Sequence, residues 1–554
     1  MIARLVIGLL IVVIGVFTYP GELIISLATR IAPQAPATAG PEGGVPWLHV
    51  AHPSGGRPYI ADDQDRLVLL HGAIPASLLE FGPGSGPVYP LDRAAYEDGQ
   101  CPPNSRISRY PPLCMTDLSQ MAALGFNSIR LPISWSLLEP QRGTFSTAYL
   151  DRVAQIVDWA RSLRMYVIVD LHQNAFSHFV GASDSTVDLA YDSGAPEWAT
   201  FTDGFSSHVA AGQRELNPAV LQATTNFWYD RDGIQDEYIA ALAFVARRFR
   251  DDSVVAGYGI YNEPLLGWNL PPGFEDLLLF PFYRRAIDAI TGAHDGLPCW
   301  SGFFMPASCG YRDLGVGDRR HLIFVDTGLL REVTDFPTHL GLPISSYPNV
   351  VLAMHAYTHI YTLDKLASLP GYPWGGYDQS YGWAEREARA MDAALFISEF
   401  GNAPADDASI LKAQLEEQEK HRTGFAFWPW KESSGGAWGM FAPPPSPEAS
   451  SGCLRVSRER MLARVYPRLS ADPGLAFHYD PSDGSFTMRA QGRAGDPTTT
   501  VHVPRQVTGQ VSSDGAVHLV ISDEPDGSRL VLATPTGGEF VVAVSSAPLS
   551  LAGC

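Results

Sequence analysis

The sequence predicts an α/β fold, namely a (β/α)8 TIM barrel followed by a small C-terminal antiparallel β-sandwich domain. Eight short apolar runs alternate with segments of helical period along most of the 554 residues. Nearly all of these runs are continuously apolar, as expected for parallel strands that are covered on both faces. Beyond about residue 470 the runs become short and alternating, with Gly, Asp and Pro between them, which is typical of an antiparallel β domain.

The eight barrel strands are expected at 66–72, 126–132, 165–173, 254–264, 321–328, 349–357, 394–401 and 424–431. Helices are expected between them, for example at 148–163 and 236–250. Polar or aromatic residues end seven of the eight runs, namely His71, Arg130, His172, Asn262 with Glu263, His355 with Tyr357, Glu399 and Trp428. Because a barrel builds its active site at the carboxyl ends of its strands, these residues predict a site there.

The first 39 residues are expected to be a signal peptide or an uncleaved membrane anchor with a linker. The apolar run 5–17 follows Arg4 and has the length of a signal-peptide core, and the small residues 37–39 fit a cleavage site. A second apolar piece at 23–28 keeps the anchor open as an alternative. The sequence therefore predicts a secreted or extracytoplasmic protein.

The domain boundaries follow from the change near residue 470, where continuous apolar runs give way to short alternating ones. The catalytic barrel is expected at 40–469, with 453–469 as its last helix, and the β-sandwich domain at 470–554. The net charge of −20 argues against nucleic acid as a partner, because phosphate binding needs a basic surface.

The six cysteines form no C-x-x-C pair and do not resemble a zinc or redox site. In an exported protein they would oxidise. Their neighbours in sequence suggest pairs 101–114 and 299–309, with Cys453 joined to Cys554, while free thiols are the alternative for some of them.

Glu263 and Glu399 are the candidate catalytic pair. The expected strands place them at the ends of the fourth and seventh strands, facing each other across the top of the barrel. Retaining cleavage of a glycosidic bond uses two carboxyl groups about 5–5.5 Å apart. One donates a proton to the leaving oxygen and the other attacks the anomeric carbon. We expect Glu263 to be the acid/base and Glu399 the nucleophile.

Three neighbours are expected to support the pair directly. Asn262 would donate its amide to a sugar 2-hydroxyl, a contact that strengthens in the transition state. Arg130 would hydrogen-bond Glu399 and keep it ionised, and Tyr357 would reach the same carboxylate.

Three further residues are expected to bind substrate. His172 and His355 would orient sugar hydroxyls or the acid, and Trp428 would offer an apolar platform for a sugar ring. Core packing explains each histidine alone equally well and Trp428 alone better, so their roles depend on the glutamate pair. No cofactor is expected. Two histidines and a carboxylate could suggest zinc, but the sequence lacks H-E-x-x-H and any close spacing, so no metal site is predicted.

The chain resembles glycoside hydrolase family 5, in the clan of retaining (β/α)8 enzymes, through GIYNEP (259–264), GFNSIRLPISW (125–135), HAY (355–357) and ISEFG (397–401). It further resembles the endoglycoceramidase-related subfamily through VIVDLHQ (167–173), GAPEWAT (194–200), LARVYPRL (462–469) and the terminal β domain. Members of that subfamily cut the bond between an oligosaccharide and ceramide. The resemblance implies the two glutamate roles above, with Arg130, His172, Asn262, His355, Tyr357 and Trp428 as supporting site residues.

Two differences from the subfamily fall where the first sugar would bind. Asn174 stands where an Asp is usual after the His-Gln pair, and 71–80 contains no sugar-binding lysine. Asn174 is therefore a candidate substrate-binding residue. The differences leave hydrolysis intact and keep the sugar and lipid open, with galactosyl ceramide, a steryl glucoside or another glycolipid as choices.

The expected function is a retaining β-glycosidase that cuts the sugar–lipid bond of a glycolipid, with peripheral membrane contact as a further expectation. The alternatives are a polysaccharide-active enzyme of endoglucanase type, a steryl glucosidase and a non-catalytic sugar-binding barrel. A lipid needs an apolar slot beside the leaving group, and the candidates are Phe176, Phe179, Val180, Leu265, Leu266, Trp268 and the run 277–283. That run has a second explanation as the buried face of a helix.

Overall fold

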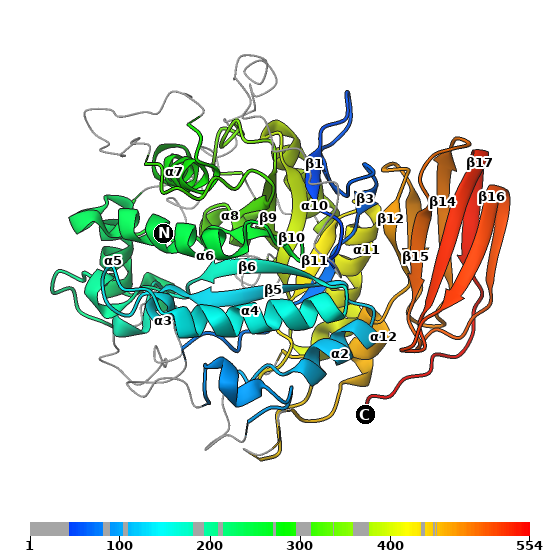
Figure 1. Cartoon of the computed structure of the whole chain (residues 1–554), viewed down its shortest axis with the longest axis horizontal. Coiled ribbons are helices and arrows are strands. Elements are labelled where there is room, and N and C mark those ends of the chain that lie inside the picture. The colour runs from blue at the N-terminus through cyan, green and yellow to red at the C-terminus, as the bar shows by residue number, and fades with distance from the viewer. Residues whose placement is uncertain are drawn as a thin grey trace, which may run out of the picture.

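The computed structural model combines a closed parallel barrel with an antiparallel sheet beside it (Figure 1). It describes residues 44–554 except 81–88, 103–108, 181–192, 209–213, 270–272, 295–311, 336, 358–375, 434–437, 447–448 and 450. The expected signal peptide or anchor at 1–39 lies outside the described residues.

Eight parallel strands follow one another around the barrel in chain order, and the last pairs with the first. Every residue in these strands is buried, which explains why the sequence shows continuous apolar runs. The strands are β4 (His71–Ala73), β5 (Ser128–Ser134), β6 (Tyr166–His172), β7 (Val255–Gly259), β8 (Leu322–Val325), β9 (Val350–His355), β10 (Ala394–Phe400) and β11 (Gly424–Phe427).

Helices surround the barrel and include the two expected at 148–163 and 236–250. They are α2 (Met115–Ala123), α3 (Trp135–Leu138), α4 (Thr147–Ser162), α5 (Pro218–Trp228), α6 (Ile234–Phe249), α7 (Phe280–Thr291), α8 (Leu329–Thr334), α10 (Tyr377–Ala390), α11 (Lys412–Lys420) and α12 (Val456–Leu462). Within the described ranges, no helix is long and apolar enough to cross a membrane.

The antiparallel domain is a sheet of nine strands, so the predicted fold class is confirmed. The strands are β1 (His49–Ala51), β2 (Tyr59–Ala61), β3 (Leu67–Val68), β12 (Tyr466–Ser470), β13 (Ala476–Tyr479), β14 (Phe486–Gly492), β15 (Thr499–Val503), β16 (Val511–Asp523) and β17 (Arg529–Val544). The first half of β17 pairs with β15 and its second half with β14, while β16 follows its other side. A separate apolar core belongs to this domain.

The expected first barrel strand, 66–72, is divided between the two sheets. Leu67 and Val68 form β3 and pair with β2 and β12, whereas the barrel strand β4 begins only at His71. His71 therefore lies at the amino end of its strand, and the expectation that it faces the active site is wrong. Its ring stacks between those of Phe425 and Tyr466, at 4.2 and 3.8 Å between centroids. An apolar run shows burial but not the point at which a chain leaves one sheet for another.

The expected helix at 453–469 is also only partly right. Helix α12 ends at Leu462, and Tyr466–Ser470 continues as strand β12 of the antiparallel sheet. The sheet thus begins before the expected boundary at 470 and includes three strands from the N-terminal part of the chain.

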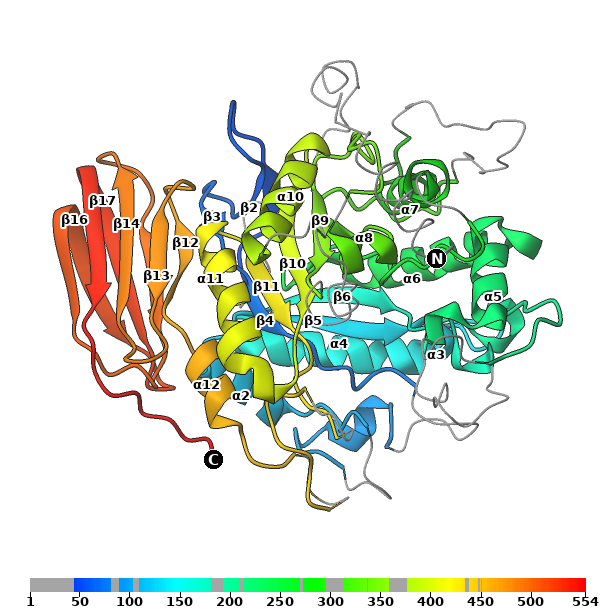
Figure 2. The same ribbon diagram turned by 180° about the vertical axis from the view of Figure 1, so that it is seen from behind.

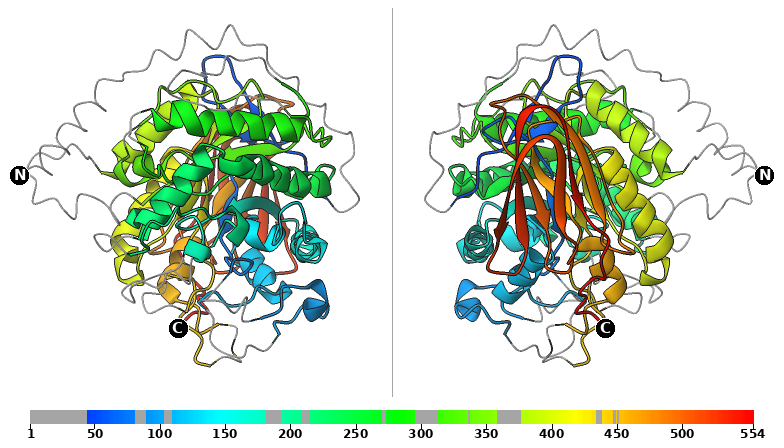
Figure 3. Two further views of the ribbon diagram at one scale, coloured as in Figure 1. Left: turned by 90° about the vertical axis from the view of Figure 1, so that its left-hand side faces the viewer. Right: turned by 90° about the vertical axis from the view of Figure 1, so that its right-hand side faces the viewer.

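The antiparallel domain packs against the amino end of the barrel, opposite the strand ends that carry Glu263 and Glu399. Besides the stacking on His71, the hydroxyl of Tyr466 donates to the carbonyl of Gly125, just before β5, at 3.0 Å. Figure 2 shows the sheet beside the barrel from behind, and in Figure 3 the sheet lies behind the barrel in the left view and in front of it in the right view. This placement makes the domain a support for the barrel and keeps it away from the catalytic end.

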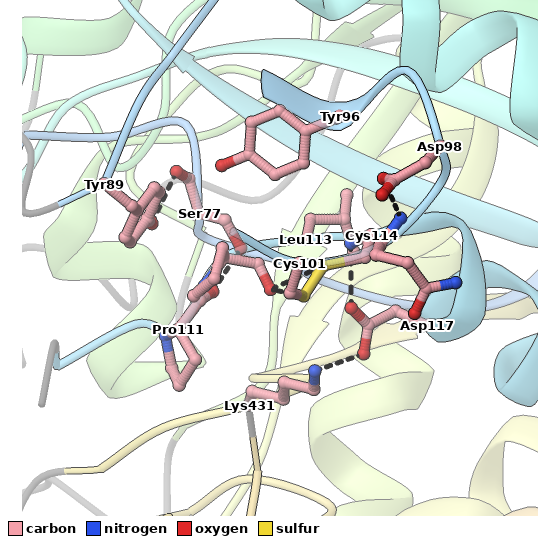
Figure 4. Close-up of a disulfide and its surroundings, with 12 residues drawn as sticks. Ser77, Tyr89, Tyr96, Asp98, Cys101, Pro111, Leu113, Cys114, Asp117 and Lys431 are labelled. Atoms are coloured by element: carbon pink, nitrogen blue, oxygen red, sulfur yellow. Dashed lines mark hydrogen bonds and ion pairs between the residues drawn. A yellow bond between two sulfur atoms is a disulfide. The ribbon is translucent and has the colours of Figure 1, made fainter. Parts of the chain in front are cut away.

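Two of the three expected disulfides are confirmed, Cys101–Cys114 and Cys453–Cys554. Figure 4 shows the first, where the Cys114 backbone N–H donates to Asp117 at 2.9 Å and Lys431 forms an ion pair with the same carboxylate. The second ties the chain end to the segment that precedes α12. Cys299 and Cys309 lie outside the described residues.

Candidate active site

Arg130 lies near the middle of β5 and connects the strand ends around it. Its Nη1 donates to Glu399 Oε2 at 2.7 Å, and its Nη2 donates to Asn262 Oδ1 at 2.7 Å. The same Nη2 is 3.0 Å from Asp170 Oδ2 on the neighbouring strand β6. Burial alone would lower the pKa of this guanidinium, but Asp170 and Glu399 raise it, so Arg130 is a fixed positive charge.

Glu399 lies near the end of β10, where the pairing with β9 is irregular. The register shifts between Ile397 and Glu399, and such a bulge redirects a side chain. Tyr357 Oη donates to Glu399 Oε1 at 2.7 Å, so each carboxylate oxygen has its own donor. Only 8% of the Glu399 side chain is exposed. A buried carboxylate that receives a phenol and a guanidinium is held in one orientation and is stabilised as an anion.

The sequence predicts Glu263 within the strand 254–264, but β7 ends at Gly259 and Glu263 lies four residues beyond it. Its backbone has φ 42°, in the left-handed region that residues other than glycine seldom adopt. Side chains hold this turn, since the Gln173 amide donates to the carbonyls of Asn262 and Glu263 at 2.8 and 2.9 Å. The Glu263 N–H also donates to Asp326 at 3.1 Å. These three bonds maintain an unfavourable backbone conformation that directs the carboxyl group.

His355, at the end of β9, contacts the Glu263 carboxyl. Its Nδ1 is 2.9 Å from Glu263 Oε1, and its Nε2 is 3.3 Å from Asp326 Oδ2. Burial lowers the pKa of His355 to about 3, so the imidazole is neutral. A neutral imidazole has one donor and one acceptor nitrogen, and it can therefore accompany Glu263 in either protonation state.

The carboxyl groups around Glu263 favour their protonated forms. Burial raises the pKa of Glu263 itself, although His172 works in the opposite direction. Burial also raises the pKa of Asp326 and of Glu332 well above the ordinary range, against the effect of nearby arginines. Glu263 is 22% exposed, so it reaches the surface while its two acidic neighbours do not. These conditions suit a proton donor.

The contacts of β9 bring the two catalytic candidates together. His355 touches Glu263 and Tyr357 touches Glu399, and the rings of these two residues lie 6.4 Å apart on one strand end. Arg130 joins the same two sides through Glu399 and Asn262. The arrangement can therefore place a protonated carboxyl and an anionic carboxylate about one sugar ring.

His172 supports the asparagine beside Glu263. Its Nδ1 is 2.9 Å from Asp170 Oδ2, and its Nε2 is 3.3 Å from Asn262 Nδ2. The Asn262 amide also donates to the carbonyl of Gln173 at 2.9 Å. Burial would raise the pKa of Asp170, but Arg130 and His172 together outweigh it and lower the pKa. Asp170 thus remains an anion that fixes both His172 and Arg130.

Trp428 and Asn174 lie on the same end of the barrel. The half-buried Trp428 ring is parallel to that of His172, with centroids 6.0 Å apart. The Asn174 N–H pairs with the Ser193 carbonyl at 2.9 Å, and its half-buried side chain remains a predicted sugar contact.

Four residues of this site were not singled out from the sequence: Asp170, Gln173, Asp326 and Glu332. The first two lie inside VIVDLHQ, where alternation along β6 places Asp170 and His172 on the same face. Asp326 directly follows β8, so it obeys the same pattern of polar strand ends and could have been found. Glu332 belongs to a short helix, and its sequence gives no sign of burial.

Two groups of side chains in the described part of the chain have the spacing of metal ligands. One contains the Cys101–Cys114 disulfide, whose sulfurs are already bonded to each other. The other is Glu263, Glu332 and His355, with one ligand atom each within 4.8 Å. In this second group the Glu263–His355 hydrogen bond already uses the facing atoms, as expected for an acid/base centre.

The apolar candidates are buried or exposed, apart from the half-buried Leu266. Phe176, Val180 and Leu265 are buried, and in 277–283 the large side chains from Leu278 onward are buried, so that run is a helix face rather than a lipid slot. Phe179 and Trp268 are exposed by 41% and 48%. The Trp268 ring lies 5.8 Å from that of Phe205, which is 46% exposed.

Comparisons with known proteins agree with this geometry. The family model "Cellulase (glycosyl hydrolase family 5)" matches residues 111–434. Endoglycoceramidase I of Rhodococcus hoagii (strain 103S) is 25% identical over 404 residues, 70% of this chain and 71% of that protein. "Probable glucan 1,3-beta-glucosidase A" of Aspergillus niger (strain ATCC MYA-4892 / CBS 513.88 / FGSC A1513) is 23% identical over 349 residues, 59% of this chain and 72% of that protein. The crystal structure of an endogalactoceramidase matches with a TM-score of 0.69 and 25% identity, over 90% of this chain and 100% of that one.

Proposed function

The chain belongs to glycosyl hydrolase family 5, and on that basis we propose that it hydrolyses the bond between a β-linked sugar and the lipid of a glycolipid. It is a retaining glycoside hydrolase, and the proposal concerns its substrate and the roles of its residues. The observation that carries it is a set of exposed apolar side chains on the segments beside Glu263. The endoglycoceramidase and endogalactoceramidase relatives support the same substrate class.

The two steps use the glutamates as follows. Glu263 gives its proton to the glycosidic oxygen as the bond to the anomeric carbon breaks, and Glu399 forms a covalent bond to that carbon. Glu263, now a carboxylate, then takes a proton from water while the water oxygen displaces Glu399. In this proposal Asn262 hydrogen-bonds the sugar 2-hydroxyl, and Arg130 and Tyr357 hold the nucleophile.

The apolar rim is defined by Phe205, Leu216, Tyr229 and Trp268. Leu216 is 48% exposed and ends the turn Arg214–Leu216, whose charges act on the Glu263 carboxyl. Helix α5 follows this turn, and Thr225 and Gln222 on it accept hydrogen bonds from the backbone and indole N–H of Trp268, at 2.8 and 3.1 Å. Since Glu263 protonates the leaving group, a group with an apolar tail would depart along this rim. The same rim is where contact with a membrane surface would occur.

A substrate panel tests this proposal. The purified protein is incubated with glycosyl ceramides, steryl glucosides and β-glucans, and the released sugars and lipids are identified by mass spectrometry. We expect intact ceramide or sterol together with free sugar. If the only products are shortened glucans, the glycolipid proposal is rejected. The substrate would then be a β-glucan, as the name of the Aspergillus relative suggests for that protein.

We also propose that the protein works outside the cytoplasm. The Cys101–Cys114 and Cys453–Cys554 bridges support this location, because disulfides persist in oxidising compartments. Fractionation of the native source, with mapping of the mature N-terminus, tests it. Recovery of the enzyme in the cytosol with an intact N-terminus and reduced cysteines would contradict it.

A further inference from the structure

We propose that Glu332 is a positioning residue for the catalytic acid, and that it donates a hydrogen bond to Glu263 once Glu263 has released its proton. The proposal goes beyond the substrate question, because it concerns how the acid is supported whatever lipid is cleaved. Its basis is a carboxyl group that is buried beside Glu263 and has no hydrogen-bond partner among the described residues.

Glu332 lies on α8, the short helix that follows β8. Its Oε2 is 3.9 Å from His355 Nδ1, the same nitrogen that contacts Glu263. Glu332, Glu263 and His355 have one polar atom each within 4.8 Å of one another, so rotation of a carboxyl group can join the two glutamates. Glu332 is 1% exposed, and neither of its oxygens has a hydrogen-bond partner in the described part of the chain.

The charged groups around Glu332 keep it neutral. Glu263, Asp326 and Glu399 all carry negative charge or the capacity for it near Glu332; the first two follow β7 and β8, and the third lies in β10. The Arg331 guanidinium on its own helix opposes them, but it is bound to Glu387 of α10. Burial and these three carboxyl groups together raise the pKa of Glu332 well above its ordinary range. A neutral carboxylic acid has one O–H donor, and while Glu263 is protonated it offers that donor only an uncharged, weaker acceptor.

The first chemical step turns that acceptor into an anion. The O–H bond of Glu263 breaks and its proton passes to the glycosidic oxygen, which keeps the electron pair of the broken C–O bond. Glu263 is left as a carboxylate, and the O–H of Glu332 can then donate to it without giving up its proton. The hydrogen bond strengthens as charge develops, so it stabilises the transition state more than the ground state.

Two variants separate this role from simple packing. Glu332→Gln keeps an N–H donor in nearly the same shape, and Glu332→Leu removes the donor. Glu80→Leu is the matched control, since Glu80 is also a buried glutamate whose pKa burial raises. The substrates are two aryl β-glycosides of one sugar, one with a leaving group that needs protonation and one with an acidic phenol that does not.

We expect Glu332→Leu to lower kcat/KM about 10- to 100-fold for the poor leaving group and less than about 3-fold for the good one, as for a lost hydrogen bond to a developing charge. Glu332→Gln should remain within about 3-fold of the wild type on both substrates. Glu80→Leu should affect the two substrates equally, because it changes only the packing of a buried carboxyl group. If Glu332→Leu also lowered kcat/KM equally for both substrates, the proposal would be overturned.

The pH profile adds a second readout. If Glu332 is neutral, Glu332→Gln leaves the basic limb of kcat/KM where it is, because no charge is removed. If Glu332 is ionised, its replacement lowers the apparent pKa of Glu263 and moves that limb to lower pH, which would overturn the proposal. The aryl glycosides carry no lipid, so rejection of the glycolipid substrate leaves this test intact.

Discussion

Glu263 and Glu399 are two glutamates in one site with opposite surroundings. Glu399 receives hydrogen bonds from the Arg130 cation and the Tyr357 phenol. Glu263 instead meets a neutral imidazole and lies beside two buried carboxyl groups. The difference teaches that neighbours, rather than residue type, decide which carboxyl holds a proton and which holds a charge. We call these the nucleophile side and the acid side.

The largest effect is expected on the nucleophile side. Glu399→Gln removes the atom that attacks the anomeric carbon and should lower kcat/KM by roughly 10⁴-fold or more for every substrate. Turnover of both an activated and an unactivated aryl β-glycoside measures it. Circular dichroism and the melting temperature check that the variant folds. Rates like those of the wild type in a folded variant would remove Glu399 from the mechanism.

The acid side should respond in a different way. Glu263→Gln removes the proton donor and should lower kcat/KM about 10²- to 10⁴-fold for a poor leaving group. For an activated phenol the first step needs no acid, so its rate should be nearly preserved. A burst of phenol followed by slow turnover is then expected, because the second step still needs a base. Equal losses for both leaving groups would break the comparison between the two sides.

The hydrogen bond on Glu399 can be tested by itself. Tyr357→Phe removes a donor to a carboxylate, which is worth about 1.5–3 kcal/mol, so kcat should fall about 10- to 100-fold. Tyr238→Phe is a matched control, because that buried phenol donates only to the backbone carbonyls of Leu171 and Ile260 among the bonds described. If the two variants behave alike, Tyr357 acts through packing and the nucleophile side depends on Arg130 alone.

The pH dependence sharpens the comparison. Glu263 must be protonated to act, and burial raises its pKa, so activity is present below that raised value and lost as pH rises through it. We expect the basic limb of kcat/KM to lie above the ordinary carboxyl range, and Glu263→Gln to abolish it.

The pKa values of Asp326 and Glu332 are also raised in the folded protein, so their neutral forms stabilise the fold. The free energy of unfolding should therefore decrease as pH rises above the ordinary carboxyl range, as urea titrations can measure.

The sequence predicted the nucleophile side more completely than the acid side. Arg130, Tyr357 and Glu399 end or lie within runs that are buried on both faces, so a polar residue among them is conspicuous. Their observed contacts match the expected ones. The barrel itself was predictable for the same reason, since its strands are continuously apolar.

The acid side depends on features that a linear pattern does not contain. Glu263 is directed by a left-handed turn that Gln173 and Asp326 hold from other strands. No motif or strand end marks Glu332 in the sequence, and only the packing of α8 shows that its side chain is buried. The division of 66–72 between two sheets was missed in a similar way, because apolar residues identify burial and leave the partner strand undefined.

The smallest effect is expected at the apolar rim, where it separates the lipid from the sugar. Trp268→Ala removes a half-exposed indole that a lipid tail would cover, and at about 25 cal/mol per Å² this should lower kcat/KM roughly 3- to 10-fold for a glycosyl ceramide in micelles. An aryl glycoside of the same sugar does not reach the rim and should be unaffected. Val520→Ala is the control, because Val520 is exposed to a similar extent on β16, a strand of the antiparallel domain at the other end of the barrel. If Trp268→Ala weakened both substrates equally, the rim would belong to the sugar site. If it weakened neither, the lipid would leave along another path. The acid side would then supply a proton to the leaving group without binding its tail at the rim.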